Sequence, residues 1–237
     1  MQTRPRIAVL VSLLAALVFA AALTSGCSSS DKKADAALPD AATLLKESNA
    51  TTTAKQSVHL QLTVNGEIKE LPIASLTGDL TNKPAVAAQG KADIVFLGQK
   101  LEGVDFVVAD GNLYGAITPN SWQDFGPAAD IYDVSAILSP DKGLANVLAN
   151  FADPKTDGRE TVNGVDTVKI TGNVSADAVN KISPQIGATG PVPGTAWVQE
   201  GGDHELVQAK LEPTPGNSVQ MTMSDWGKSV TVTKPAV

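Results

Sequence analysis

The most specific chemical feature of the chain is Cys27, its only cysteine. Arg4 and Arg6 precede an apolar stretch over residues 7–23, and the small residues 24–26 lie directly before the cysteine. A basic start, an apolar stretch and small residues before a cleavage point are typical of a secretory signal. Because this signal ends in Gly-Cys, we predict cleavage after residue 26. We also predict that Cys27 carries the lipid anchor, an S-diacylglycerol and an N-palmitoyl group.

Two other interpretations of this segment stay open. The apolar stretch could be an uncleaved membrane anchor, although about 17 residues is the lower limit for a span. Cys27 could also be an ordinary thiol, but it has no second cysteine to pair with in an oxidising compartment. Thr24 departs from the aliphatic residue that is commoner three positions before a lipidated cysteine. The position after Gly26 favours lipidation, and with it a place on the extracytoplasmic, periplasmic face of the cell membrane.

Few other residues could perform chemistry. His59 and His204 are the only histidines, and each lies in a polar strand or turn, where a structural or solvated role is the simpler interpretation. The chain has no Gly-x-Ser-x-Gly elbow, no glycine-rich phosphate loop and no His-x-x-x-His pair. We therefore predict no catalytic residue, no metal site and no cofactor, so that the protein is not an enzyme.

Composition sets the class of domain and excludes some partners. Removal of the signal leaves 237 − 26 = 211 residues, enough for one domain with a substantial core. Acidic residues exceed basic ones by 25 to 18, which disfavours nucleic acid as a partner. Aromatic residues are only 4% of the chain, so a core of small aliphatic side chains leaves room for a ligand. We expect a signal peptide over 1–26, a flexible tether over 27–39 and a single, monomeric domain over 40–237.

Most elements of this domain should be strands. Asp40 can cap a helix that runs to about residue 52. Alternating polar and apolar residues over 59–64, followed by Asn65-Gly66, predict a strand and a two-residue hairpin. The return strands would cover 67–73 and 76–80. The further strands expected are 92–96, 104–108, 113–117, 167–171, 195–199, 206–211, 218–224 and 229–233.

Helical segments interrupt the strands in the middle of the chain. Short helical turns are expected over 126–132 and 134–138. Asp141 can cap a helix over 143–151, and Ser175 can cap another over 176–182. This order predicts an α+β domain in which helices gather on one face of a curved antiparallel sheet.

Several longer motifs resemble a known family. They lie at 57–66, 105–114, 122–133, 143–153 and 216–222, and they are similar to the mycobacterial LppX/LprA/LprF/LprG lipoproteins, above all to the LprG members. The resemblance covers essentially the whole mature chain. It implies a half-barrel, a curved antiparallel sheet wrapped around helices with an apolar cavity between them. It also implies a carrier that takes triacylated lipids and glycolipids from the plasma membrane toward the outer envelope, together with a major-facilitator-type exporter.

The cargo implied by the family comprises triacylglycerol, phosphatidylinositol mannosides and lipoarabinomannan. Strand and helix periodicity supplies the residues that we expect to line such a cavity: Leu62, Val64, Ala92, Ile94, Phe96, Val104, Phe106, Val108, Leu144, Leu148, Met221 and Met223. An apolar face of this kind is normally filled by other side chains, and periodicity does not distinguish a filled core from a hollow one. An adaptor lipoprotein that docks on an exporter without lipid cargo is therefore the alternative. Hydrolysis of envelope lipids would need an activated nucleophile, which we do not find.

Overall fold

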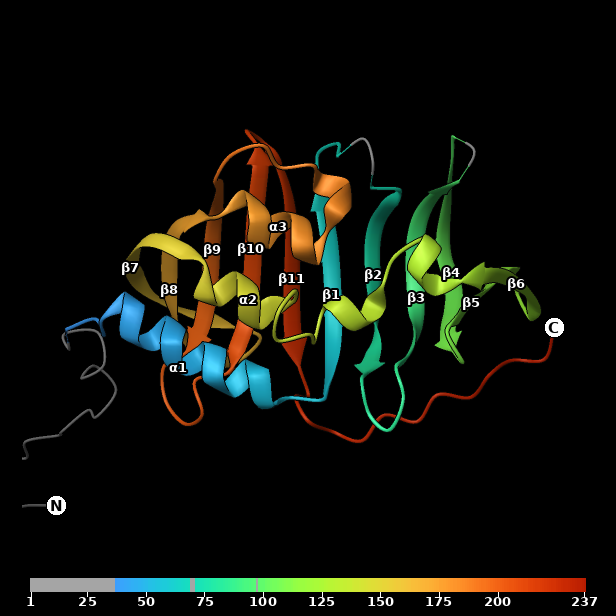
Figure 1. Ribbon diagram of the computed structural model, residues 1–237, viewed down its shortest axis with the longest axis horizontal. Coiled ribbons are helices and arrows are strands. Elements are labelled where there is room, and N and C mark those ends of the chain that lie inside the picture. The colour runs from blue at the N-terminus through green and yellow to red at the C-terminus, as the bar shows by residue number, and fades with distance from the viewer. Residues whose placement is uncertain (1–36, 69–70, 97) are drawn as a thin grey trace, which may run out of the picture. The chain divides into compact units, whose positions relative to one another are not determined.

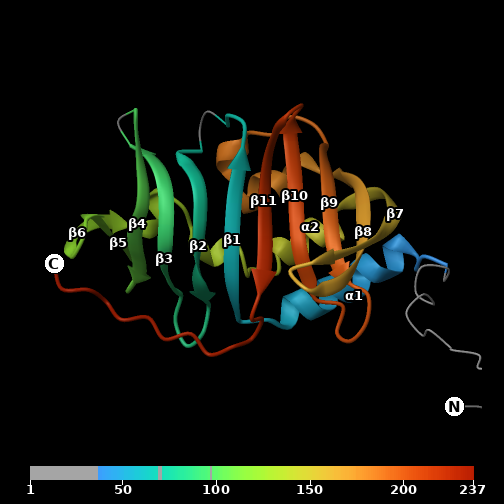
Figure 2. The ribbon, with the colours of Figure 1, turned by 180° about the vertical axis from the view of Figure 1, so that it is seen from behind.

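The computed structural model describes residues 37–68, 71–96 and 98–237. They form one open, antiparallel sheet of 11 strands in the order β6-β5-β4-β3-β2-β1-β11-β10-β9-β8-β7, with β6 and β7 at the edges (Figures 1 and 2). The strands are β1 Ser57–Asn65, β2 Ile73–Thr81, β3 Ala87–Phe96, β4 Gln99–Ala109, β5 Asn112–Thr118, β6 Ser121–Pro127, β7 Phe151–Val162, β8 Val165–Val174, β9 Val192–Gln199, β10 Leu206–Thr214 and β11 Asn217–Ser224.

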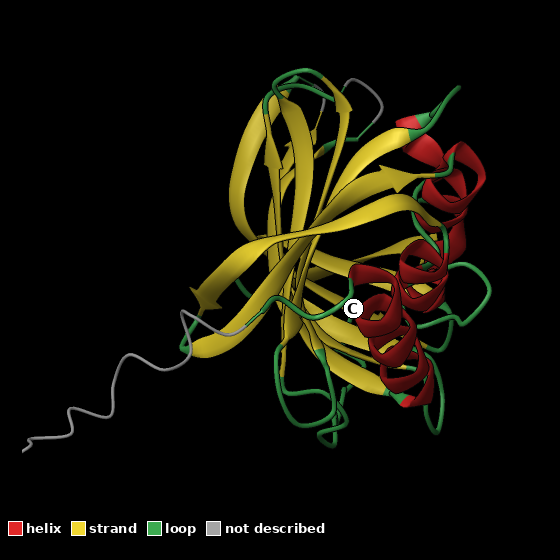
Figure 3. Ribbon diagram, turned by 90° about the vertical axis from the view of Figure 1, so that its left-hand side faces the viewer, coloured by secondary structure: helices red, strands yellow, loops and turns green. Residues whose placement is uncertain are grey.

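All helices lie on one side of this curved sheet, which we call the helical face; the opposite side is the outer face (Figure 3). The helices are α1 Ala41–Ala54, α2 Leu144–Ala149 and α3 Ala176–Ile182, with 3₁₀ turns η1 Ala128–Asp130, η2 Val134–Ala136 and η3 Pro184–Ile186. The predicted fold class is confirmed: an antiparallel sheet is wrapped around helices, and it stays open instead of closing into a barrel. Among the described residues, no helix combines the length and apolarity needed to cross a bilayer.

Two helix starts follow the predicted capping chemistry. The Asp40 carboxylate accepts a hydrogen bond from the Thr43 backbone N–H at 2.8 Å, at the start of α1. The Ser175 hydroxyl accepts one from the Ala178 N–H at 3.3 Å, at the start of α3. These bonds satisfy backbone donors that a helix leaves free in its first turn, which explains why both helices begin there.

The predicted two-residue hairpin at Asn65-Gly66 is wrong. β1 ends at Asn65 and pairs with the single strand β2, which begins only at Ile73, so the two strands are not joined by a two-residue turn. Pro72 lies directly before β2 and lacks the N–H that a ladder requires, which explains why the strand starts after it. The two return strands expected at 67–73 and 76–80 are one strand, Ile73–Thr81.

Three other expectations need correction. Asp141 does not cap α2, because its N-cap is Gly143, which has no side chain, and the helix ends at Ala149. Residues 151–162 and 121–127 form the edge strands β7 and β6, which were not predicted; polar residues, Pro and Gly are common on edges and hide the alternation. No strand forms at 229–233, where the described chain has no regular structure.

The C-terminal segment crosses the strands on the outer face instead of extending the sheet. Val232 packs against a small apolar cluster made by Val107, Ala109 and Tyr114. The Lys234 ammonium lies 5.3 Å from the centre of the Tyr114 ring. Figures 1 and 2 show this segment running from β11 past the ends of β1 to β4. It therefore covers apolar side chains that the outer face of β4 and β5 would otherwise expose.

Candidate functional site

A row of aliphatic side chains crosses four strands on the helical face. It consists of residues that pair across neighbouring strands: Val58 on β1, Leu80 on β2, Ala88 on β3 and Val108 on β4. All four are at most 5% exposed and belong to the main apolar cluster. This first row is thus packed core, covered by the helix layer.

A second row lies two residues from the first on each strand, and its two central positions are glycines. It runs from Leu60 through Gly78 and Gly90 to Phe106. A Cβ atom added to Gly90 would collide with the Thr77 carbonyl oxygen. The two glycines therefore allow β2 and β3 to approach closely, which any larger residue would prevent.

The third row places one apolar side chain on each of the four strands. It consists of Leu62 on β1, Leu76 on β2, Ala92 on β3 and Val104 on β4, and Met221 on β11 pairs with Leu62. Leu62, Leu76 and Met221 are only half-buried, in contrast to the first row. The helix layer thus covers the first row fully, whereas in the third row only Ala92 and Val104 are buried and the other three side chains are partly exposed.

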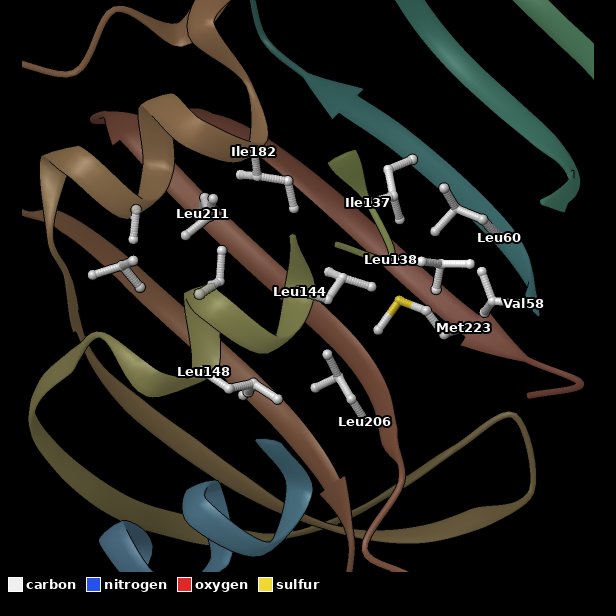
Figure 4. Packing of buried hydrophobic residues seen from close by; sticks show 14 of the residues in the cluster. Val58, Leu60, Ile137, Leu138, Leu144, Leu148, Ile182, Leu206, Leu211 and Met223 are labelled. Carbon is white, nitrogen blue, oxygen red and sulfur yellow. The ribbon is translucent and has the colours of Figure 1, made fainter. Parts of the chain in front are cut away.

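The helix layer contributes apolar side chains of its own. Figure 4 shows Leu144 and Leu148 of α2, with Ile137 and Leu138 of the preceding segment, against the strands β10, β11 and β1. All four belong to the same buried cluster as the first row. Apolar side chains therefore face each other from the sheet and from the helices, which is the arrangement predicted for an acyl-chain site.

Some buried polar side chains in the helix layer lack hydrogen-bond partners among the described residues. The hydroxyls of Ser48 and Thr52 on α1, and the amide nitrogen of Asn146 on α2, are buried without a hydrogen-bond partner among the described residues. Each such group costs about 1–3 kcal/mol relative to its hydrated state. These unpaired groups are therefore a local cost to the packing of α1 and α2.

The structure brings most of the predicted lining residues to one face. Val108, Leu144, Leu148 and Met223 belong to the buried cluster, and Phe106 and Met221 pack against it. Ala92 and Val104 are buried, while Leu62, Val64 and Ile94 are half-buried. The side chain of Phe96 lies outside the described residues. That these residues line a cavity stays a prediction.

Two residues of this face were missed by sequence reasoning. Leu60 and Leu76 lie between predicted lining residues on the second and third rows. Leu76 was missed because residues 67–80 were divided between two strands. The alternation of Leu76, Gly78 and Leu80 with polar neighbours was the signal for one continuous strand.

Two small hollows lie away from the predicted lining residues. One, of about 220 Å³, lies on the outer face between His59, Asp79 and Gln89 and the C-terminal segment. The other, of about 150 Å³, lies between the η1–η2 segment and α3, with Lys142 and Lys181 among its lining residues. Pockets for drug-sized ligands measure about 300–1,000 Å³, so neither would hold a lipid with several acyl chains.

The histidines have structural partners. His59 Nδ1 lies 2.7 Å from an Asp79 carboxylate oxygen, and His204 Nδ1 lies 3.0 Å from the Gln199 carbonyl oxygen. Within residues 37–68, 71–96 and 98–237, no three His, Cys, Asp or Glu side chains gather in a way that could hold a metal ion. These contacts account for both histidines without a catalytic role. Cys27, the predicted lipid attachment site, and the predicted signal peptide lie outside the described residues.

Comparison with known proteins places this arrangement in a family. Residues 40–232 match the LppX_LprAFG lipoprotein family. The chain is 63% identical over 237 residues, all of both chains, to the lipoarabinomannan carrier protein LprG of Mycolicibacterium smegmatis. It is 54% identical over 227 residues to the LprG of Mycobacterium tuberculosis, covering 96% of this chain and 95% of that protein.

Solved structures agree with the sequence match. Mycobacterium bovis LprF has a TM-score of 0.77 and 30% identity, covering 84% of this chain and 99% of LprF. Mycobacterium tuberculosis LppX has a TM-score of 0.64 and 27% identity, covering 81% of this chain and 97% of LppX. An apolar face opposed by a helix layer, a match over the whole domain and close full-length relatives give one conclusion: the chain belongs to the LppX/LprA/LprF/LprG lipoprotein family.

Proposed function

We propose that this protein is a membrane-anchored lipid carrier, without catalytic activity, that holds acyl chains between the helical face of its sheet and its helix layer. The observation that carries this proposal is the third row, where Leu62 and Leu76 are half-buried although the first row of the same face is fully packed. An acyl chain laid along these side chains would complete their burial. The naming of close relatives as lipoarabinomannan carriers supports the same class of ligand.

The energetics explain why such a carrier is useful. Exposing an acyl chain to water costs about 0.8 kcal/mol per methylene, or on the order of 12 kcal/mol for a chain of about 16 carbons. Three chains cost about three times as much, so spontaneous transfer of a triacylated lipid through water is negligible. A protein that replaces water with an aliphatic face removes most of this cost.

Binding requires room that the packed rows do not leave, so we propose that the helix layer moves away from the sheet when a lipid enters. The unpartnered hydroxyls of Ser48 and Thr52 support this idea, because separation would let water satisfy them. The proposed cargo is triacylglycerol, phosphatidylinositol mannosides and lipoarabinomannan. Transfer would run from the plasma membrane toward the outer envelope, with a major-facilitator-type exporter as partner.

The lipid on Cys27 would hold the domain on the extracytoplasmic face of the membrane. A tether of 13 residues, 27–39, reaches at most about 45 Å when extended, which keeps the domain at high local concentration near its source of lipid. The secreted Cys27→Ser form should therefore bind lipid normally but fail to restore lipid transport in cells that lack the protein. Full restoration would mean that the anchor is not needed for function.

The central test is lipid transfer between vesicles. Donor phosphatidylcholine vesicles carry fluorescent triacylglycerol, and acceptor vesicles carry none. Cys27→Ser protein, free of its own acyl groups, should accelerate transfer in proportion to its concentration. A folded protein that gives no acceleration would contradict the carrier function. That result would favour the adaptor alternative, in which the packed first row and α2 form a permanently solid core.

A further inference from the structure

Burial of the helical face decreases along each of the strands β1 to β4 in the same direction. A fourth row of apolar side chains lies beyond the third. Ile94 on β3 pairs with Ile73 on β2 and with Leu101 on β4, and Val64 lies two residues beyond Leu62 on β1. All four side chains of this row are half-buried, whereas the first-row residues of the same strands are at most 5% exposed. The helix layer therefore closes the face at the first row and leaves the fourth row partly uncovered.

An exposed apolar side chain adjoins the fourth row where β3 meets β4. Val95 follows Ile94 on β3 and is 48% exposed. The last pair of the two strands joins residues 96 and 99, so Val95 lies close to the end of the hairpin. We call Ile94, Val95 and Leu101 the β3–β4 end. The sequence over 94–97 is apolar throughout, and such a run beside an exposed valine is typical of a binding surface.

The charged residues of this part of the molecule do not form a basic patch. The Lys100 ammonium lies 2.8 Å from a Glu102 carboxylate oxygen, and both side chains are more than half exposed. In sequence, residues 66–72 and 93–103 together hold two lysines and four acidic residues. The β3–β4 end and the connection beside it therefore carry a small excess of negative charge.

The neighbouring elements are balanced in the same way. Ion pairs join the following residues of the strands and of α3: Lys91–Asp105, Lys210–Glu212 and Lys181–Asp177. In the helix layer, Lys142 and Lys181 line a hollow together with Asp133. These charges give no surplus of ammonium groups that would attract anionic lipid head groups.

We propose that the lipid site opens at the fourth row and that the β3–β4 end inserts into the surface of the bilayer, so that acyl chains pass there between membrane and sheet. This inference rests on the proposed carrier function. Stable protein interfaces bury about 800 Å² on each partner, which the end of one hairpin does not offer, whereas a fluid bilayer accepts single apolar side chains. Because the contact is apolar, docking should be as efficient on uncharged vesicles as on anionic ones, and little affected by salt.

A fluorescent label tests the membrane contact directly. Cys27 is the only cysteine of the chain, so in the Cys27→Ser protein a Val95→Cys substitution supplies a unique thiol. A nitrobenzoxadiazole label on this thiol should brighten when uncharged phosphatidylcholine vesicles are added, and spin-labelled acyl chains should quench it. Val86→Cys is the matched control, because Val86 is 37% exposed and lies directly before β3, at the opposite end of the strand. Its label should not respond to the vesicles.

The vesicle transfer assay tests whether lipid enters and leaves at this end. In the Cys27→Ser background, Val95→Asp should slow transfer about tenfold or more, because it removes an apolar side chain and adds a charge that the acyl region excludes. Val86→Asp makes the same chemical change at the other end of β3 and should transfer lipid at the parent's rate. Both variants should keep the parent's melting temperature and its lipid stoichiometry in detergent solution, since both side chains are exposed.

Several outcomes would overturn the docking inference. They are a label at residue 95 that stays in water, equal responses at residues 95 and 86, a response on anionic vesicles alone, and equal transfer by Val95→Asp and the parent. Normal vesicle transfer by Val95→Asp combined with lost lipid transport in cells would also overturn it, in favour of a protein partner at this end. A label that inserts while the parent transfers no lipid would instead contradict the carrier function and leave the membrane contact in place.

Discussion

Replacement of Ala92 by tryptophan is the sharpest perturbation of the proposed site. Ala92 is the smallest residue of the third row, 8% exposed, and pairs with Leu76 and Val104. An indole at this position would project from the centre of the helical face into the space that an acyl chain needs. The neighbouring residue Lys91 is exposed on the opposite, outer face of the same strand. Lys91→Trp therefore supplies the matched control.

The expected loss of affinity follows from the volume that the indole occupies. If the ring excludes about five methylenes of one acyl chain, at about 0.8 kcal/mol each, binding weakens by about 4 kcal/mol. That corresponds to a dissociation constant higher by about a thousandfold. Overpacking should also lower the free energy of unfolding by about 1–3 kcal/mol, which a domain of this size tolerates. Val108→Trp is a poorer test, because Val108 lies in the packed first row and its replacement would strain the core itself.

The assay is equilibrium binding of a fluorescent triacylated lipid, with thermal unfolding followed by circular dichroism on the same samples. Ala92→Trp should unfold cooperatively yet bind at least a hundredfold more weakly than the parent, while Lys91→Trp should bind as the parent does. Equal affinity of folded Ala92→Trp and parent protein would refute the placement of the acyl chains on this row. Equal weakening by both tryptophans would show that the ring acts through stability and not by occupying the site.

Three further predictions concern the sheet that carries the site. Gly90→Ala should lower the free energy of unfolding by about 2 kcal/mol or more, because the added Cβ would collide with the Thr77 carbonyl oxygen. Gly158→Ala is the control, since a Cβ added there has no neighbouring atom within 4 Å and should change the free energy of unfolding little. Equal effects of the two variants in urea unfolding would contradict the close approach of β2 and β3. Val232→Asp should release the C-terminal segment from the cluster around Tyr114, measured as faster hydrogen exchange in residues 229–237, and unchanged exchange would count against that contact. Hydrogen bonds from the Gly103 N–H and the Ser75 hydroxyl hold the pKa of Asp93 below its usual value, so its contribution to stability is present above the unfolded-state pKa and lost as pH falls through the lower folded-state pKa. Asp93→Asn should therefore unfold at a lower denaturant concentration than the parent at pH 7, with the difference shrinking below about pH 4; a difference independent of pH would exclude the carboxylate as its cause.

The parts of the fold that sequence reasoning found are those with a local physical signal. Asp40 and Ser175 are capping residues that predict where their helices begin. The alternation around Ala92 and Val104 predicts one apolar face even when the strand pairing is not known. The same alternation on β11 correctly placed Met221 and Met223 on this face. Local rules were sufficient there because each strand has one buried and one exposed side.

The errors occurred where a distant contact decides the structure. Asn65-Gly66 carries a hairpin signal, yet β2 begins only after Pro72. The Asn217 side chain at the start of the neighbouring strand β11 accepts a hydrogen bond from the Glu67 N–H at 3.1 Å. Val232 alternates as a strand residue would, but its apolar partner lies on β4 and β5, across the strand direction. No local pattern reports such a contact.

The sequence predicted which residues lie on the apolar face, but not how far the helix layer buries each of them. Periodicity assigned Val108 and Leu62 the same status, although the structure buries Val108 under the helix layer and leaves Leu62 half-buried. That difference depends on where the η1–η2 segment and α2 cross the sheet. It also separates the packed part of the face from the part that we propose meets lipid.

Native mass spectrometry of the Cys27→Ser protein, after incubation with triacylglycerol and removal of free lipid, tests the central claim most directly. The carrier function predicts a folded monomer whose mass increases by that of one triacylated lipid, with the increase absent in Ala92→Trp and present in Lys91→Trp. A folded protein that shows only its own mass at saturating lipid, or the same lipid mass in both tryptophan variants, would contradict it.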